Sequence, residues 1–387
     1  MPQFLFKYCR KWVNMVLCNI AFKFRVYPTK EQQILINKTF GCCRFIYNYF
    51  LAKRRNAWLK NKESINYNQT CAMLTKLKKH EQYKWLKDVD CTSLQNSLKD
   101  LDRAYQNFFK KCAKYPRFKL KKVHAQSYRT RNNSNTVCII GNKIKLPKIG
   151  LVRAKIHRNV VGRILNATIT RTATDKYFVS LCVEVDKSAL MHSNAGGMIG
   201  IDVGISSLYT DSNGRKVDNL HAFKRRARRL KLTQQRLARK KKGSKNYEKQ
   251  RKKVARVHEK IANIRKDYTH KQSAILVHEN QIIAIETLHV KNIVKNRKLA
   301  KAIYDACWAE LFRQLQYKAQ FIGSKVIEVD PFYPSSQLCS CCEYRNPNVK
   351  KLNIRMWTCP NCGAFHDRDI NAAKNILQQA LKKIVTQ

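Results

Sequence analysis

The chain has 387 residues, 44 % of them hydrophobic, which is enough to build two or three domains with substantial cores. Its 78 Lys and Arg against 25 Asp and Glu give a formal net charge of +53, and self-repulsion of that size favours a polyanionic partner such as nucleic acid. No apolar run is long enough to span a bilayer, and fifteen cysteines, an odd number, form no evident disulfide framework, so we expect a cytoplasmic protein with no membrane partner.

The first part of the chain resembles a poor signal peptide. Asn14 and Asn19 interrupt its apolar stretch, and no small-residue cleavage site follows. We therefore expect residues 1–20 to be a non-essential leader, with Met15 as an alternative start.

Strand and helix signals follow the leader. Residues 22–26 alternate as in a strand, and Thr29 and Gln32 have capping-box spacing at the start of a helix. From Thr92 onward, leucine and aromatic side chains recur every three or four positions, as on the apolar face of a second helix. We expect residues 21–115 to form a strand plus a helical bundle whose wet, basic face grips phosphates.

The pattern changes from helix to strand at about residue 116. Two short alternating runs around Gly141 and Asn142 predict a hairpin, and residues 177–185 alternate cleanly. A small β-barrel or a curled sheet over residues 116–192 is the expectation, followed by a linker at 193–197.

The remaining chain, residues 193–387, reads in the order strand pair, long helical stretch, strand, helix, strand and final helix, which suits a mixed α/β sheet. In the strand pair a Ser-Asn-Gly turn joins two strands. The helical stretch, from 223 to about 276, is strongly basic and should break at Gly243. Such a polar helix is either a solvated arm or a clamp on nucleic acid, and the charge of the chain favours the clamp. Another helix is expected around 302–322.

Two Cys-x-x-Cys pairs near the C-terminus have the spacing of a metal site. Cys339 and Cys342 form the first pair, Cys359 and Cys362 the second, and sixteen residues separate them. Four thiolates satisfy tetrahedral zinc and leave no position for water, so the metal would be structural. A redox role for either pair is the alternative, and Cys341 is expected to be a spare thiol.

Three carboxylates stand where a charge is costly unless it binds something. Asp202 lies within an apolar strand, Glu286 ends another apolar strand, and Asp369 falls in the first turn of the final helix. Brought together, they would make an oxygen-rich site for hard divalent cations, Mg²⁺ above all.

Structural explanations remain open for these residues. Asp367 and Asp369 could both simply cap a helix N-terminus, which favours negative charge. Asp330 is a rival third ligand, although the proline after it indicates a turn, and His366 is a nearby candidate metal or substrate contact. A lone histidine is more often neither.

Several stretches together resemble a known family. They are AFKFRVYPTKEQ, GIDVG, IIAIETL, VDPFYPSSQLCSCC and WTCPNCGAFHDRDINAAKNI. These residues resemble TnpB (OrfB-type) proteins of bacterial and archaeal insertion sequences, which are similar to compact ancestors of the type V CRISPR effectors. The resemblance extends from Ala21 to the final helix. One departure is Glu343, where the family often has glycine, so we expect a less tight turn there.

The resemblance implies a multidomain α+β protein. Its N-terminal half would be a helical bundle inserted into a wedge-like β-barrel, and residues 193–387 an RNase H-like (RuvC) α/β nuclease domain with a zinc ribbon inserted at 336–366. The family order Asp, Glu, Asp falls on Asp202, Glu286 and Asp369 as catalytic ligands of Mg²⁺, with two ions expected. The four cysteines would hold structural Zn²⁺, and a ribbon mutation should lower cleavage by misplacing Asp369.

The implied activity is RNA-guided cleavage of DNA by Mg²⁺-dependent hydrolysis. The implied partners are a guide RNA from the same element and a double-stranded DNA target, in a nucleoid-associated prokaryotic protein. Two rivals stay open: a true transposase that acts by strand transfer, and a zinc-ribbon DNA-binding regulator of transposition without catalysis. The carboxylate order argues against the first, and the second predicts binding without an RNA requirement.

Overall fold

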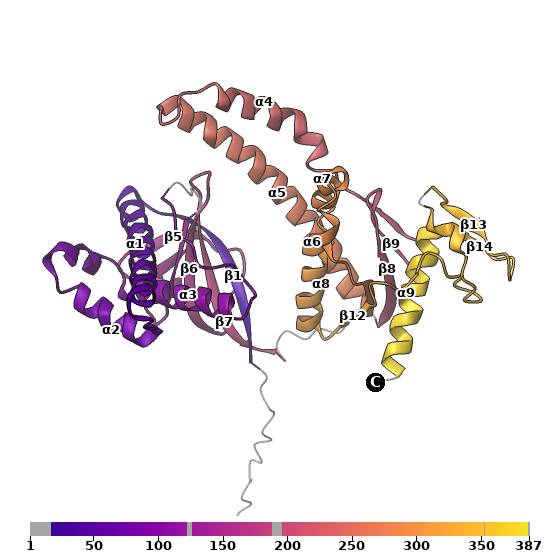
Figure 1. The fold of residues 1–387 in the computed structure, drawn as a ribbon, viewed down its shortest axis with the longest axis horizontal. Helices are drawn as coiled ribbons and strands as arrows, with labels where there is room; N and C mark the ends of the chain where they lie inside the picture. The colour runs from indigo at the N-terminus through magenta and orange to yellow at the C-terminus, as the bar shows by residue number, and fades with distance from the viewer. Residues whose placement is uncertain (1–16, 122–125, 188–195, 352, 386–387) are drawn as a thin grey trace, which may run out of the picture. The chain divides into compact units, whose positions relative to one another are not determined.

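A computed structural model describes residues 17–121, 126–187, 196–351 and 353–385. The chain divides into two compact units, residues 1–187 and 188–387, which are treated one at a time (Figure 1). Among the described residues, no helix is both long and apolar enough to cross a membrane.

The elements of the first unit are β1 (Leu17–Tyr27), α1 (Lys30–Asn61), α2 (Tyr67–Leu77), the 3-10 helix η1 (Glu81–Asp88), α3 (Cys91–Phe109), β2 (Gln126–Arg131), β3 (Cys138–Ile140), β4 (Lys143–Leu146), β5 (Gly150–Lys155), β6 (Arg163–Arg171) and β7 (Tyr177–Asp186). The seven strands form one sheet in the order β2-β6-β7-β1-β5-β4-β3. Helices α1 and α3 pack against β2, at one end of this order. The unit is therefore a helical insertion on an antiparallel sheet.

Strand β1 differs most from its prediction. It lies inside the sheet, paired with β7 from Leu17↔Asp186 to Val26↔Tyr177, and with β5 on its other side. Residues 17–20 thus belong to the sheet, and the expected leader is too long by four residues; residues 1–16 lie outside the described residues. Of the two predicted forms, a barrel or a curled sheet, the structure has the curled, open sheet, since the end strands β2 and β3 are not paired with each other (Figure 1).

Local signals in this unit were well predicted. The Thr29 side chain accepts a hydrogen bond from the Gln32 backbone at 3.3 Å, and the Gln32 side chain accepts one from the Thr29 backbone at 3.0 Å. This reciprocal pair is the predicted capping box at the start of α1. The β3–β4 hairpin turns at Gly141 and Asn142, as expected. Helix α3 begins one residue before the predicted Thr92, because the Asp90 carboxylate caps it.

The elements of the second unit are β8 (Gly197–Val203), β9 (Ser207–Asp211), β10 (Lys216–Asp218), the 3-10 helix η3 (Lys224–Arg226), α4 (Ala227–Ala238), α5 (Lys245–Glu279), β11 (Asn280–Glu286), α6 (Val290–Ile293), α7 (Arg297–Ala306), α8 (Trp308–Ile322), β12 (Lys325–Val329), the 3-10 helix η4 (Pro347–Lys350), β13 (Met356–Thr358), β14 (Phe365–Asp367) and α9 (Arg368–Val385). Its main sheet has the order β10-β9-β8-β11-β12. Strands β8, β11 and β12 run parallel, and β9 and β10 run antiparallel to their neighbours, which makes the mixed sheet that the element order predicted.

Helices cover both faces of this sheet. On one face, Ile201 and Ile285 pack into a core with side chains of α5 and α8. On the other face, Ala284 packs with Ile376 and Ala380 of α9. Because side chains alternate along a strand, residues next to Ile201 and Ile285 face α9.

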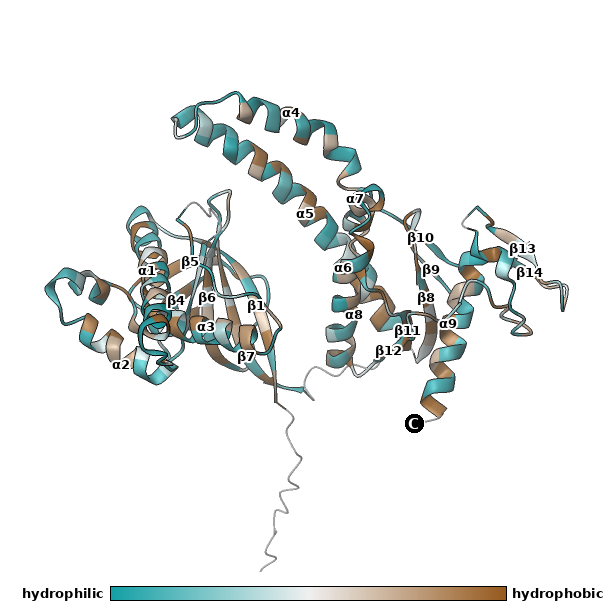
Figure 2. Cartoon of the chain, viewed as in Figure 1, coloured by the Kyte–Doolittle hydropathy of each residue, from teal (hydrophilic) through white to brown (hydrophobic). Residues whose placement is uncertain are grey.

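Two boundaries in this unit differ from the predicted ones, and a third agrees. The predicted strand pair is three strands, since the chain turns between β8 and β9 as well as at the Ser-Asn-Gly turn before β10. The helix predicted over 302–322 is two helices, because Cys307 adopts a left-handed conformation with φ of 60°. The basic stretch breaks at Gly243, as predicted, into α4 and α5, both largely hydrophilic (Figure 2).

Candidate active site and metal centre

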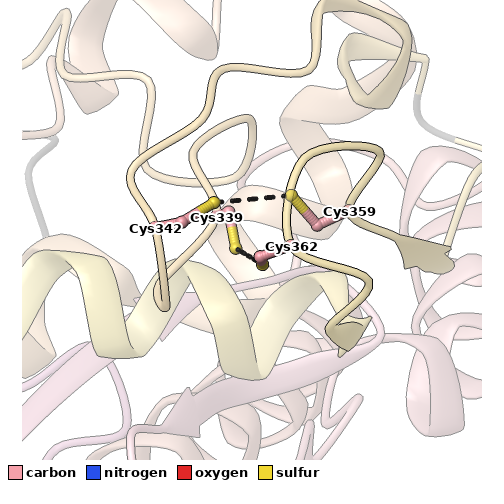
Figure 3. A group of neighbouring side chains, drawn as sticks. All are labelled: Cys339, Cys342, Cys359 and Cys362. Carbon is pink, nitrogen blue, oxygen red and sulfur yellow. Dashed lines mark hydrogen bonds between the residues drawn. The ribbon is translucent and has the colours of Figure 1, made fainter.

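The four predicted cysteines converge on one point of the second unit (Figure 3). Their sulfur atoms all lie within 4.8 Å of one another, with Sγ–Sγ distances of 3.6 Å for Cys339–Cys362 and for Cys342–Cys359. Zn–S bonds of about 2.3 Å in a tetrahedron would place the sulfurs about 3.8 Å apart. The donor set therefore fits a single four-coordinate metal ion.

Two matching turns present the cysteine pairs. In the first, Glu343 donates its backbone N–H to Cys339 at 2.9 Å, and in the second Gly363 donates to Cys359 at the same distance. Glu343 and Gly363 have φ of 59° and 70°, the left-handed region that favours glycine. The expectation of a looser first turn is therefore wrong: Glu343 takes the glycine conformation, and its carboxylate pairs with Lys382.

His366 lies against the metal centre. Its Nε2 is 3.1 Å from Cys339 Sγ, and its ring, which is buried, lies on Trp357 with centroids 4.8 Å apart. Cys341 is exposed, but its sulfur also falls within 4.8 Å of the Cys339 and His366 ligand atoms. The tetrahedral group and this second group share one cysteine.

Asp202 and Glu286 lie side by side on neighbouring parallel strands. Ile201 of β8 pairs with Ile285 of β11, so the next residues, Asp202 and Glu286, follow in register at the same edge. Both side chains fall on the face that α9 covers, because the isoleucines before them face the opposite core.

Asp369 reaches the same place from the first turn of α9. Burial raises the pKa of Asp202 well above its usual value, and the nearby charges of Glu286 and Asp369 raise it further. Burial also raises the pKa of Glu286 to about 7, although a backbone hydrogen bond from Val203 acts in the opposite direction. The three carboxylates thus form one electrostatic group from two strands and a helix.

An arginine from the cysteine region completes this group. The Arg355 guanidinium lies 3.2 Å from Asp369 Oδ1. The charges of Arg368 and Arg355 offset part of the rise in the pKa of Asp202. The three carboxylates are not among the described groups whose ligand atoms all lie within 4.8 Å of one another. No sequence signal singled out Arg355, because one arginine in so basic a chain cannot be distinguished from the others until its partner is known.

The rival carboxylates have structural partners. Asp367 Oδ1 accepts hydrogen bonds from the backbone of Asp369 at 3.0 Å and Ile370 at 3.2 Å, so it caps α9 as the structural explanation proposed. Its other oxygen pairs with Lys216 at 2.7 Å. Asp330 accepts a hydrogen bond from the Phe332 backbone at 2.8 Å, in the turn that the following proline indicated.

Comparisons with known proteins show the family of the chain. A family described as "Probable transposase" (OrfB_IS605) matches residues 180–297, a "Cas12f1-like, TNB domain" matches 308–376, and a "Helix-turn-helix domain" of OrfB type matches 15–63. The chain is 40 % identical to a Streptomyces pristinaespiralis protein named "Putative RNA-guided DNA endonuclease", over 93 % of this chain and 89 % of that one. It is 34 % identical to "Putative RNA-guided DNA endonuclease InsQ" of Escherichia coli K12, over 92 % and 91 %.

A solved structure shares the fold. The protein in a Cas12f1–sgRNA–target DNA complex superimposes with a TM-score of 0.50 at 14 % identity, covering 93 % of this chain and 98 % of that one. Fold and site together define a multidomain α/β protein in which a carboxylate group and a four-cysteine centre lie on one unit. The chain belongs to the OrfB family of insertion-sequence proteins, the TnpB-like proteins.

Proposed function

We propose that this protein is a transposon-associated, RNA-guided DNA endonuclease. The observation that carries the proposal is the meeting of Asp202, Glu286 and Asp369 at one end of β8, β11 and α9. Relatives at 40 % and 34 % identity that span nearly the whole chain bear names with this activity. Family and site chemistry therefore support the same conclusion.

The three carboxylates are the proposed catalytic ligands, in an RNase H-like (RuvC) domain. Their oxygens suit hard cations, and at Asp202 burial, together with the charges of Glu286 and Asp369, favours the exchange of a proton for a metal ion. Bound Mg²⁺, as two ions, would activate a water and stabilise the leaving oxygen of a phosphodiester. Arg355 offsets part of the negative charge at Asp369.

The four cysteines are proposed to hold Zn²⁺ in a ribbon. Four sulfurs at tetrahedral spacing leave no open position, so the metal orders the surrounding loops and takes no part in hydrolysis. The ribbon connects directly to α9 through β14, which explains how a structural metal site comes to lie beside Asp369.

The proposed partners are a guide RNA and a double-stranded DNA target. Base pairing with the guide would supply specificity, and a heteroduplex of about 20 bp carries about 40 phosphates, a number comparable with the charge excess of +53. Residues 224–266, in η3, α4 and α5, contain twenty Lys and Arg against two Glu. We propose that this helical hairpin holds the phosphate backbone of the nucleic acid. The helical insertion and sheet of the first unit would serve recognition.

Asp202→Ala tests the assignment. The variant, purified with RNA expressed from its own element, should lose cleavage of a matched DNA by about 10³-fold or more while guided binding is kept. Cleavage assays and gel shifts with matched and mismatched targets measure the two properties. Undiminished cutting by the alanine variant would exclude Asp202 from the site, and equal binding without RNA would favour the non-catalytic regulator.

A further inference from the structure

Helix α9 is fixed by the sheet. The Ala373 carbonyl approaches β8 so closely that a Cβ built on Gly200 would lie 2.0 Å from its oxygen. Ile376 and Ala380 continue this face into the buried core. The sheet therefore positions α9 from Ala373 onward, one turn after Asp369. The ribbon, in turn, must be positioned relative to α9.

Two asparagines on α9 bind the first cysteine turn. Asn371 donates through Nδ2 to Leu338 O at 2.6 Å and accepts from the Ser340 backbone N–H at 2.9 Å. Asn375 donates to Leu338 O and to Ser335 O, both at 2.7 Å. The two side chains are only 1 % and 2 % exposed. We call Asn371 and Asn375 the asparagine clamp.

The clamp grips the backbone on both sides of a metal ligand. Leu338 and Ser340 flank Cys339, so the carbonyl and the N–H that the clamp needs are in place only when this turn has its ligand-presenting shape. An apolar contact would hold the ribbon without such a directional requirement. The hydrogen bonds of the asparagine clamp therefore form only in one orientation of the first cysteine turn.

The second half of the ribbon reaches α9 through Arg355. Its carbonyl accepts the Arg368 backbone N–H at 2.8 Å, and its guanidinium lies on Asp369. The Arg355 side chain is 58 % exposed, so the placement of the ribbon decides where it lies. The cysteine centre connects the half that the clamp holds to the half that carries Arg355.

We propose that Asn371 and Asn375 are positioning residues for the cleavage reaction: they dock the ribbon on α9 so that Arg355 stays on Asp369. This inference rests on the proposed function. The clamp touches neither the carboxylates nor nucleic acid in this role; its effect passes through the ribbon to Arg355.

A double-mutant cycle on the full, RNA-loaded protein tests the proposal. The variants are Asn371→Ala with Asn375→Ala, Arg355→Ala, and all three together. The clamp variant should cleave about 10- to 100-fold more slowly, with target binding unchanged and one zinc per chain retained, because a small misplacement is enough to reduce the rate. The triple variant should be no more than about 2-fold slower than Arg355→Ala alone, since both changes remove the same interaction.

Gln378→Ala is the matched control. Its side chain is exposed and donates to Ser340 O at 3.1 Å, on the same turn, and its loss should change the rate by less than about 2-fold. If the clamp variant loses zinc, Asn371→Asp, which keeps the oxygen that accepts from Ser340, takes its place in the cycle.

Three results would overturn the proposal. They are a clamp variant that cuts like wild type, additive losses in the triple variant, and loss of zinc in Asn371→Asp as well, which would make the clamp a fold-stabilising contact. A wild-type protein that fails to cut, or whose cutting survives Asp202→Ala, would instead count against the proposed function.

Discussion

Gly200 lies two residues before Asp202, on the strand face against α9. A methyl group there would fall 2.0 Å from Ala373 O and 2.9 Å from Leu377 Cβ, so the helix must move. Gly200→Ala should lower the free energy of unfolding by about 1–3 kcal/mol and slow cleavage, because Asp369 moves with α9. Denaturant melts and cleavage rates measure both effects.

Gly41→Ala is the control for this substitution. Gly41 lies within α1, and the nearest atom to an added Cβ is at 4.0 Å, in the flexible Arg44 side chain. Alanine is the better helix former by about 1 kcal/mol, so this variant should be as stable as wild type or more so. A Gly200→Ala protein as stable and active as the control would show that the close approach to α9 is not constraining.

Glu286 makes stability depend on pH. Burial raises its pKa from 4.5 to about 7, so the folded protein holds a proton that the unfolded chain releases. The stabilisation is complete below pH 4.5 and is lost as the pH rises through 7. Without Mg²⁺, the melting temperature of wild type relative to Glu286→Gln should therefore fall between pH 5 and 8.

Under the proposed function, Mg²⁺ should reverse this loss. A cation takes the place of the proton, so the Mg²⁺ concentration for half-maximal cleavage should fall as the pH rises from 6 to 8. Thermal melts and Mg²⁺ titrations at fixed ionic strength follow the two effects. Parallel pH profiles for wild type and Glu286→Gln would mean that Glu286 titrates normally.

Residue-scale prediction worked where residue type and spacing carry the chemistry. The two Cys-x-x-Cys pairs specified a four-sulfur group from sequence, whereas the catalytic role that a charge inside an apolar strand indicated for Asp202 stays a prediction. Arg355 and Asn371 were missed because their importance comes from what lies opposite them in space. Neither a basic nor an amide side chain is unusual in its local sequence.

At the scale of elements, Asp305 joins three helices. Buried on α7, it pairs with Arg265 of α5 at 2.8 Å and accepts the backbone N–H of Phe223 and Lys224 at the start of η3. Asp305→Ala leaves a cation and two N–H groups without this partner. It should lower the free energy of unfolding by about 3–5 kcal/mol.

An exposed ion pair on α5, the helix that carries Arg265, provides the comparison. Asp267 and Lys271 of α5 lie 2.9 Å apart with side chains 66 % and 68 % exposed. Asp267→Ala should change stability by no more than about 1 kcal/mol, because water screens such pairs. Urea melts of both variants measure the free energy of unfolding. Equal decreases in the two variants would show that Asp305 does not connect the three helices.

Element boundaries were predictable where a strong local signal exists. Thr29 with Gln32 gave the start of α1, and Gly243 gave the break before α5. The break between α7 and α8 was missed because Cys307, which takes the left-handed conformation, is neither glycine nor asparagine. A local sequence pattern does not reveal such a conformation.

At the scale of the whole molecule, the charge of +53 should govern the affinity for the proposed guide RNA. If six to ten phosphates are neutralised, RNA affinity should fall by about 10³- to 10⁵-fold between 50 and 200 mM salt, because bound counterions are released. Fluorescence titrations of a labelled RNA at several salt concentrations measure the slope. An affinity independent of salt would contradict binding driven by phosphate contacts.

Whole-molecule architecture was predicted in part. The order of elements after residue 196 was enough for a mixed sheet, since β9 and β10 follow through turns and β12 follows β11 through helices, although β11 pairs with β8 and not with the preceding β10. The first unit was divided into a helical part and a barrel because sequence distance hides that β1 pairs with β7. Pairing between strands so far apart leaves no periodic trace in either strand.

The place of β1 has a consequence for synthesis. Strand β1 pairs with β7, residues 177–186. These residues leave the ribosome about 150 residues after β1, which takes roughly ten seconds or more at usual translation rates. Helices α1 and α3, with contacts nearer in sequence, can assemble meanwhile, whereas the strand waits with open edges. A nascent chain halted before β7 would thus carry an unpaired, aggregation-prone strand at its beginning.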